Sequence, residues 1–161
     1  MTNTAIIGLG NLLLGDEGLG IKAVQELTEE APDNVSVIDG GTPGFRLLNS
    51  FEEYEKVIII DAVKMQKEKG DIVEFKVNKA PDIEKLSLSA HDIDFLDALA
   101  VGEEMEILPE IKVYGIEIGK VDRTNYTMEL SKEIKEKLPK LIEKVLSEVK
   151  NESNPQKTHN N

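Results

Sequence analysis

Four consecutive β-branched residues, Val57 to Ile60, constrain the fold of this chain more than any other feature. A strand that is apolar at every position, rather than at every second one, has to be covered on both of its faces. Such strands occur in parallel sheets whose strands are connected by helices. The run therefore predicts the central strand of an α/β protein.

The rest of the chain alternates β-branched runs with helical patterns. Segment 71–77 alternates polar and apolar residues, which favours a more exposed strand. Pro139 lies inside the last predicted helix and is expected to kink it. The chain shows no internal repeat and no linker, so we expect one α/β domain over residues 1–150 and a polar, frayed tail over 151–161. The predicted strands are 5–9, 35–38, 57–60, 71–77 and 111–118, and the predicted helices are 19–31, 44–51, 92–101 and 131–150.

Composition narrows the class of protein and its partners. The 161 residues are enough for a sizeable core, and their net charge of -12 disfavours nucleic acid and anionic membranes as partners. Without cysteine there are no disulfides, no thiolate metal ligands and no cysteine nucleophile, which suits a reducing cytosol. The first residues are polar, and no apolar run approaches the ~20 residues of a membrane span. We therefore expect a soluble, cytoplasmic protein.

A glycine-rich loop, GLGNLLLGDEGLG, occupies residues 8–20 between the first predicted strand and helix. This is the usual position of a dinucleotide-binding loop, but Leu13 stands where the third glycine of that fingerprint is required. Asp16 and Glu17 also place two carboxylates where a pyrophosphate would need free N–H groups. The loop is therefore not expected to bind NAD or ATP.

Four ionisable residues follow predicted strands: Glu17, Asp39, Asp61 and His91. Ligands of open parallel sheets bind beyond the carboxyl ends of the strands, which makes these residues candidates for one site. Each also has a purely structural alternative: Asp39 as a turn residue before two glycines, Asp61 as a cap, and His91 as a cap or a core imidazole. An acid in the first turn of a helix stabilises that helix by interacting with its dipole. We assign this structural role to Asp16. Two carboxylates and an imidazole suit nickel, zinc, iron or manganese, and affinity alone does not separate these metals.

Five motifs cover nearly the whole predicted fold: GLGNLLLGDEGLG at 8–20, DGGTPG at 39–44, VIIIDAV at 57–63, SAHDIDFLDAL at 89–99 and VYGIEI at 113–118. Taken together, these motifs resemble the hydrogenase maturation endopeptidases, which trim the large subunit of nickel–iron hydrogenases. The resemblance implies a three-layer α/β/α sandwich around a five-stranded, mostly parallel, mixed sheet. It also implies one antiparallel strand, for which segment 71–77 is the candidate.

The resemblance also implies a function and roles for individual residues. Glu17, Asp61 and His91 correspond to a trio that recognises nickel already installed in the substrate, so no intrinsic catalytic metal is expected. Asp39 corresponds to an acidic residue implicated in catalysis, which makes general base a possible role. The implied activity is that of an aspartic or metallo-type endopeptidase, gated by nickel, acting on the large-subunit precursor. The neighbouring residues Gly40, Gly41 and Thr42 are then the candidate substrate-binding residues.

Three points qualify this hypothesis. A protein that docks on the nickel-loaded subunit without cutting it, as a chaperone of assembly, is the alternative function. The chain also departs from the family at two places. The family often has a proline shortly after the glycine of the last strand, where this chain has Ile118 after Gly115, and the segment 119–130 is unusual. Both departures lie where substrate contact is expected, so they bear on the partner and not on the chemistry. We expect the protein to act as a monomer.

Overall fold

A computed structural model describes residues 3–42, 44, 46–77 and 92–152 of the chain. Its five strands form a single sheet in the order β2-β1-β3-β5-β4. Strand β4 pairs antiparallel with β5, and the other neighbouring strands are parallel. This confirms the predicted mixed sheet and the choice of its antiparallel strand. The strands are β1 (Thr4–Leu9), β2 (Val35–Gly41), β3 (Lys56–Val63), β4 (Ile72–Val77) and β5 (Glu110–Glu117).

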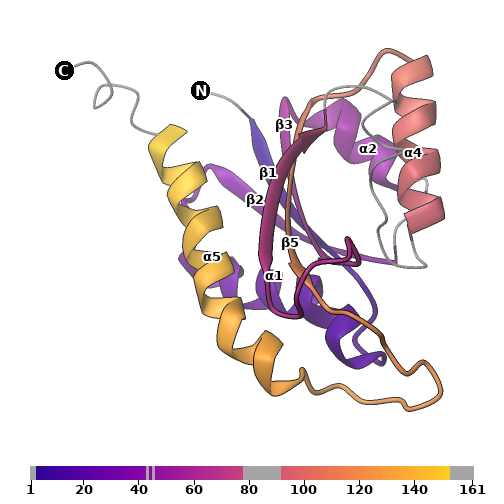
Figure 1. Ribbon diagram of the computed structural model, residues 1–161. Helices are drawn as coiled ribbons and strands as arrows, with labels where there is room; N and C mark the ends of the chain where they lie inside the picture. The colour runs from indigo at the N-terminus through magenta and orange to yellow at the C-terminus, as the bar shows by residue number, and fades with distance from the viewer. Residues whose placement is uncertain (1–2, 43, 45, 78–91, 153–161) are drawn as a thin grey trace.

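Helices cover both faces of the sheet, which confirms the three-layer α/β/α sandwich (Figure 1). The helices α1 and α5 pack on one face, and α2 and α4 pack on the other. Among the described residues, no helix combines the length and the apolar character needed to cross a membrane. The helical elements are η1 (a 3-10 turn, Gly15–Gly18), α1 (Leu19–Glu30), α2 (Arg46–Glu53), α4 (Asp92–Glu104) and α5 (Lys132–Glu152).

Strand β3 shows why its apolar run constrained the fold. All eight of its residues are buried. Ile58 and Ile60 belong to the core under α1 and α5, whereas Val57 and Ile59 belong to the core under α2 and α4. Each fully buried side chain of this size contributes about 1.5–3 kcal/mol of hydrophobic transfer free energy. Strand β3 thus contributes side chains to both hydrophobic cores.

Some elements run further than their sequence patterns predicted. Strand β3 continues beyond Ile60 to Val63, because β5 pairs with it in parallel along its whole length. Helix α5 runs through Pro139 and ends at Glu152, two residues beyond the predicted end. Helix α2 begins at Arg46 rather than at residue 44. The segment 153–161 lies outside the described residues.

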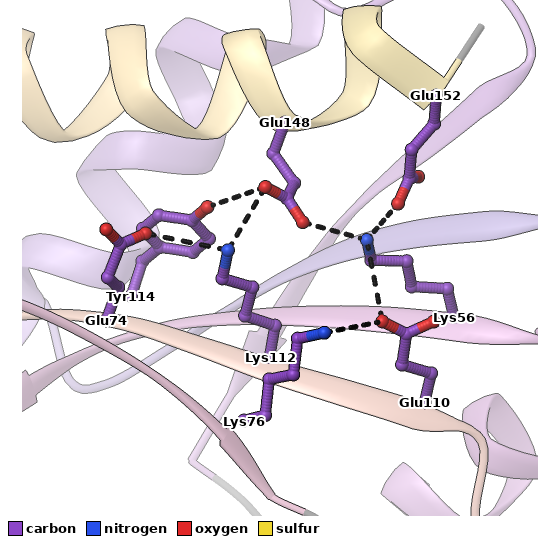
Figure 2. A network of polar contacts seen from close by, with 8 residues as sticks. All are labelled: Lys56, Glu74, Lys76, Glu110, Lys112, Tyr114, Glu148 and Glu152. Atoms are coloured by element: carbon purple, nitrogen blue, oxygen red, sulfur yellow. Dashed lines mark hydrogen bonds and ion pairs between the residues drawn. The ribbon is translucent and has the colours of Figure 1, made fainter. Parts of the chain in front are cut away.

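A cluster of charged side chains joins α5 to the edge of the sheet where β3 and β5 begin (Figure 2). The Lys56 ammonium is buried and contacts the carboxylates of Glu152, of Glu148 at 2.9 Å and of Glu110 at 3.9 Å. We call this group the amino-edge cluster. Its members are Lys56, Glu74, Lys76, Glu110, Lys112, Tyr114, Glu148 and Glu152.

The pKa values of the amino-edge cluster reflect mutual stabilisation of opposite charges. Burial alone would lower the pKa of Lys56, but hydrogen bonds and charge attraction from Glu152 and Glu148 outweigh it and raise the pKa. Burial alone would raise the pKa of Glu148, but its bonds to Lys56 and Lys112 outweigh that effect and lower the pKa. The pKa of Lys112 is raised, because its bonds to Tyr114 and Glu148 exceed the cost of desolvation. Folding therefore favours the protonated form of the two lysines and the ionised form of Glu148.

The strand order fixes where a ligand can bind. The chain leaves β1 toward β2 on one side and returns to β3 on the other side, so β1 and β3 flank a topological switch point. Crevices at such points open beyond the carboxyl ends of the strands. The glycine-rich loop follows β1 at this position.

Candidate functional site

Close backbone contacts explain the glycines of the loop. A Cβ at Gly20, in the first turn of α1, would lie 2.3 Å from the carbonyl oxygens of Leu9 and Ile60. A Cβ at Gly10, where φ is +144°, would lie 2.1 Å from the carbonyl oxygen of Glu17. Contacts this short are possible only for glycine. The glycines thus bring η1 and the start of α1 directly onto the carboxyl ends of β1 and β3.

The backbone N–H groups of this loop are used within the protein. Asn11 donates to the Glu17 carbonyl at 3.1 Å, and Glu17 donates to the Leu14 carbonyl at 3.2 Å. Gly10 donates to Gly41 at 3.0 Å, and other N–H groups of the loop likewise find acceptors inside the protein. A phosphate-binding loop has to offer such groups to its ligand. The N–H groups with these internal acceptors are therefore not offered to a phosphate.

Glu17 is a buried carboxylate with cations beside it. Only 1% of its surface is exposed. The guanidinium of Arg123 donates a hydrogen bond of 2.8 Å to its Oε1, and the Lys64 ammonium lies 3.9 Å from the same oxygen. The sequence analysis did not identify Arg123, which lies 106 positions away in the loop between β5 and α5. This ion pair offsets the cost of burying a charge.

Asp16 is bound to the start of α5. The Ser131 N–H donates to its Oδ1 at 2.7 Å, the Ser131 hydroxyl donates to its Oδ2 at 2.8 Å, and Lys69 lies 3.4 Å from Oδ2. These bonds tie the glycine-rich loop to the residue that precedes the last helix. Such contacts fit the structural role assigned to Asp16, although its partner is Ser131 and not only the helix dipole.

Asp61 is also buried, with 3% of its surface exposed. It lies within β3 and not directly after it, because the strand extends to Val63. It pairs in register with Gly115 of β5, so the neighbouring position carries no side chain. Its Oδ1 accepts a hydrogen bond of 2.8 Å from the N–H of Ala62. A cap for a following segment is therefore the wrong description of Asp61.

Asp39 lies two strands away from Asp61. Gly8 of β1 pairs with Asp39 on one side and, on the other, with Ile60, the residue before Asp61. The spacing of neighbouring strands therefore puts the two aspartates roughly 10 Å apart. The Asp39 side chain is exposed, and its Oδ1 accepts a hydrogen bond of 2.9 Å from the Gly41 N–H. The turn geometry of the structural alternative is thus present. The flanking candidates Gly40 and Gly41 are half-buried and Thr42 is exposed.

Glu117 is a buried carboxylate that sequence reasoning missed. It is 1% exposed at the end of β5. Its Oε1 accepts hydrogen bonds from the N–H groups of Met65 at 2.6 Å and Lys67 at 3.1 Å, and its Oε2 accepts one from Gly119 at 3.0 Å. These bonds fix the loops that follow β3 and β5, next to Glu17 and its cations. No spacing in the sequence indicates this role.

The predicted trio is described in part. His91 lies outside the described residues, and within the described ranges no three ligating side chains gather closely enough to hold a metal ion. Glu17 and Asp61 are two buried carboxylates at the carboxyl ends of the central strands. Carboxylates there can receive a cation, orient a bound group or accept a proton. The fold and site together define an α/β protein with an acidic site at its switch point.

Comparisons with known proteins identify the family. A family model described as hydrogenase maturation protease matches residues 21–148, so the chain belongs to the hydrogenase maturation proteases. A Methanocaldococcus jannaschii protein assigned by name to that family, MJ0253, is 34% identical over 148 residues, covering 90% of this chain and 95% of that protein. The chain is accordingly a hydrolase, an endopeptidase of hydrogenase maturation.

Two further relatives extend the comparison. The hydrogenase maturating endopeptidase HybD of Escherichia coli superimposes with a TM-score of 0.81, at 25% identity, over 94% of each chain. The coenzyme F420 hydrogenase subunit delta of Methanothermobacter thermautotrophicus is 29% identical over 154 residues, covering 89% of this chain and 92% of that protein. The likeness thus spans nearly the whole domain.

Proposed function

We propose that the chain cleaves the nickel-loaded precursor of a nickel–iron hydrogenase large subunit and releases a short C-terminal peptide. The observation that carries this proposal is the burial of Glu17 and Asp61 at the switch point of a hydrogenase maturation protease. Carboxylates are costly to remove from water unless a positive charge meets them. In the protein alone, the Arg123 guanidinium supplies that charge at Glu17. A metal delivered by the substrate would take its place when the two proteins bind.

In this proposal nickel belongs to the substrate. Glu17, Asp61 and His91 recognise nickel that substrate thiolates already hold, using its vacant coordination positions. The protein has no resident catalytic metal, acts as a monomer and works in the cytoplasm. An empty precursor offers no cation to the two buried carboxylates and is therefore left uncut.

The proposed chemistry is the hydrolysis of one peptide bond. Asp39 accepts a proton from a water molecule whose oxygen attacks the scissile carbonyl carbon. When the tetrahedral intermediate collapses, the carbon–nitrogen bond breaks and the leaving amine takes up the proton. Gly40, Gly41 and Thr42 adjoin Asp39 and would hold the peptide there.

The decisive experiment compares nickel-loaded and metal-free precursors. Each is incubated with the protein, and the mass of the large subunit is measured. We expect a loss of mass for the nickel-loaded precursor only. Cleavage of both forms would contradict nickel gating, and cleavage of neither form would contradict the protease proposal.

Asp39→Asn separates the two roles open to Asp39. The asparagine oxygen still accepts the hydrogen bond from Gly41, so the turn is preserved while the proton acceptor is removed. We expect binding of the nickel-loaded precursor within about twofold of wild type and a loss of cleavage of 10²-fold or more. Both are measured with the same precursor, by biolayer interferometry and by mass. A variant that cuts at the normal rate would leave Asp39 as a turn residue alone.

A second candidate function is a docking protein that binds the nickel-loaded subunit without cutting it. The observation that favours it is the relative named as a hydrogenase subunit, which matches 89% of this chain. The two candidates differ in one measurement, the mass of the large subunit under conditions where the two proteins bind. An unchanged mass would select the docking protein.

A further inference from the structure

Exposed apolar side chains gather beside the candidate site. Of the four large apolar side chains that are exposed in the described part of the chain, Leu13 (53%), Tyr126 (73%) and Met128 (53%) lie on two adjoining segments. The fourth, Met105, is 57% exposed and lies between α4 and the start of β5, so it is near the amino ends of the parallel strands. Clustered exposure of this kind is typical of interaction surfaces, whereas scattered exposure is ordinary.

Hydrogen bonds hold the two segments together. The Thr127 N–H donates to the Leu13 carbonyl at 3.0 Å, and the Gly15 N–H donates to the Thr127 carbonyl at 2.8 Å. A Cβ at Gly15 would lie 3.3 Å from the Thr127 methyl group, so this side chain faces the glycine-rich loop. Tyr126 and Met128 flank Thr127 on this fixed backbone. A surface ordered in advance loses less entropy when a partner binds.

A groove adjoins Met128 between α1 and α5. It has a volume of about 380 Å³, and Leu130, Leu138 and Pro139 are among the residues that line it. Its charged lining residues are Lys22, Glu26, Glu129 and Lys135. A hollow lined by both apolar and charged side chains, beside exposed apolar side chains, can take an anchoring side chain from a partner protein.

The same two segments also build the candidate site. Arg123, three positions before Tyr126, donates to the Glu17 carboxylate, and Asp16 holds Ser131 at the other end of the loop. Leu13 is four positions from Glu17. A protein that brings a metal to Glu17 therefore lies within reach of these apolar side chains.

We propose that Leu13, Tyr126 and Met128 form a docking surface for the hydrogenase large-subunit precursor. The surface contacts an apolar patch of the precursor next to the metal that Glu17 meets. Tyrosine and methionine are enriched in protein interfaces, and tyrosine is a frequent hot spot. This assignment rests on the proposed function, and it identifies which part of the unusual segment 119–130 contacts the partner.

The experiment uses the full chain and the nickel-loaded precursor of its own hydrogenase. The double variant Tyr126→Ser, Met128→Ser is compared with wild type for binding, by biolayer interferometry, and for cleavage. We expect Kd and KM to rise at least about tenfold, while kcat stays within about twofold, because the side chains do not touch the reacting atoms. Leu13→Ser is expected to shift Kd and KM in the same direction.

Met105→Ser is the matched control, since it removes an equally exposed methionine from the other edge of the sheet. We expect it to leave Kd, KM and kcat unchanged. A double variant with wild-type Kd and KM would overturn the docking surface while leaving the protease proposal intact. If wild type binds without cutting, the protease proposal fails, and the Kd values of the variants still decide the docking surface. If wild type does not bind the precursor, both proposals fail.

A second copy of the chain is the competing occupant of this surface. Sedimentation of wild type and of the double variant separates the two occupants, and we expect both proteins to be monomers. A wild-type dimer that the double variant abolishes would assign the surface to self-association and overturn the proposal.

Discussion

Arg123 is the residue that decides how accessible Glu17 is to an incoming cation. Its guanidinium lies 2.8 Å from Oε1 of a carboxylate that is 1% exposed. A metal ion that binds this oxygen has to displace the guanidinium, because two cations cannot occupy the same position beside one carboxylate. Arg123 is itself 41% exposed in its side chain, so water can receive it when it leaves. The ion pair therefore competes with metal binding.

Replacing Arg123 by glutamine is expected to strengthen the binding of free Ni²⁺ by about tenfold, a change of about 1.4 kcal/mol. The competitor is removed while a polar side chain of similar length is kept. Isothermal titration of the protein with nickel chloride measures the affinity. Lys120→Gln is the control, since it removes the same charge from the same loop three positions away. An unchanged affinity in Arg123→Gln would show that the guanidinium does not compete for the metal.

At this scale, the sequence allowed prediction of some residues and not of others. The sequence predicted that Glu17 and Asp61 lie near the carboxyl ends of the central strands, and the structure places both there, although Asp61 lies within β3. Their roles stay predictions. Arg123 and Glu117 were not predicted, because their bonds join segments that are 106 and 50–52 positions apart. Only the folded chain brings such segments together. His91 lies outside the described residues, so its role stays a prediction.

Helix α1 approaches the sheet more closely than an ordinary helix because of Gly20. A Cβ at this position would meet the carbonyl oxygens of Leu9 and Ile60 at 2.3 Å. Backbone atoms cannot rotate away as a flexible side chain can, so the whole helix would have to shift. Because η1 immediately precedes α1, a shift of α1 would also move Glu17.

Gly20→Ala is therefore expected to destabilise the protein by about 3 kcal/mol, the upper part of the usual range for overpacking. For a domain of this size the corresponding fall in Tm is about 6–12 °C. Thermal unfolding followed by circular dichroism measures it. Gly44→Ala is the comparison, because a Cβ at Gly44 meets nothing within 4 Å. Equal Tm values for the two variants would contradict the close approach of α1.

Helix α5 depends on the amino-edge cluster for part of its attachment to the sheet. Lys56→Met keeps the apolar stem of the lysine but leaves Glu148 and Glu152 without its charge. We expect a loss of about 2 kcal/mol, less than for a fully buried pair because these carboxylates are partly exposed. Urea unfolding gives the free energy of unfolding. Lys76→Met should change it by less than about 0.5 kcal/mol, because Lys76 is 58% exposed. A similar loss in both variants would assign the effect to net charge.

The elements themselves were largely predictable, and their ends were not. The sequence located every strand and α-helix that the structure describes, because buried faces require apolar residues at fixed spacing, but it did not predict the 3-10 turn η1. The end of β3 was predicted at Ile60 because Asp61 breaks the apolar run. Hydrogen bonding to β5 continues to Val63, since the backbone pairs regardless of the side chain. Asp61 therefore interrupts the apolar run without ending the strand.

On the scale of the whole molecule, the two ends of the parallel strands, the carboxyl edge and the amino edge, carry different groups of residues. The carboxyl edge carries Glu17, Asp61 and the exposed apolar surface. The amino edge carries the cluster that binds α5 (Figures 1 and 2). Changes at well-separated sites that share no partners usually have additive effects. Stability and activity should therefore respond separately to substitutions at the two edges.

The dependence of stability on pH tests this separation. The lowered pKa of Glu148 means that its stabilising effect is fully present above its ordinary pKa of about 4.3 and is lost as the pH falls through the lowered value. The raised pKa of Lys56 means that its effect is fully present below about pH 10.4 and is lost as the pH rises through the raised value. Between about pH 5 and pH 10 the contribution of both residues is constant.

Glu148→Gln is therefore expected to lower Tm by a constant few degrees between pH 5 and pH 9, since glutamine cannot carry the charge that Lys56 and Lys112 stabilise. The difference from wild type should shrink as the pH falls from about 4.3 through the lowered pKa of Glu148, because the protonated glutamate resembles glutamine. Over pH 5 to 9, and at a temperature where both proteins are folded, kcat/KM should be the same for both. A Glu148→Gln variant with normal Tm but altered kcat/KM would show that the two edges are coupled through β3 and β5.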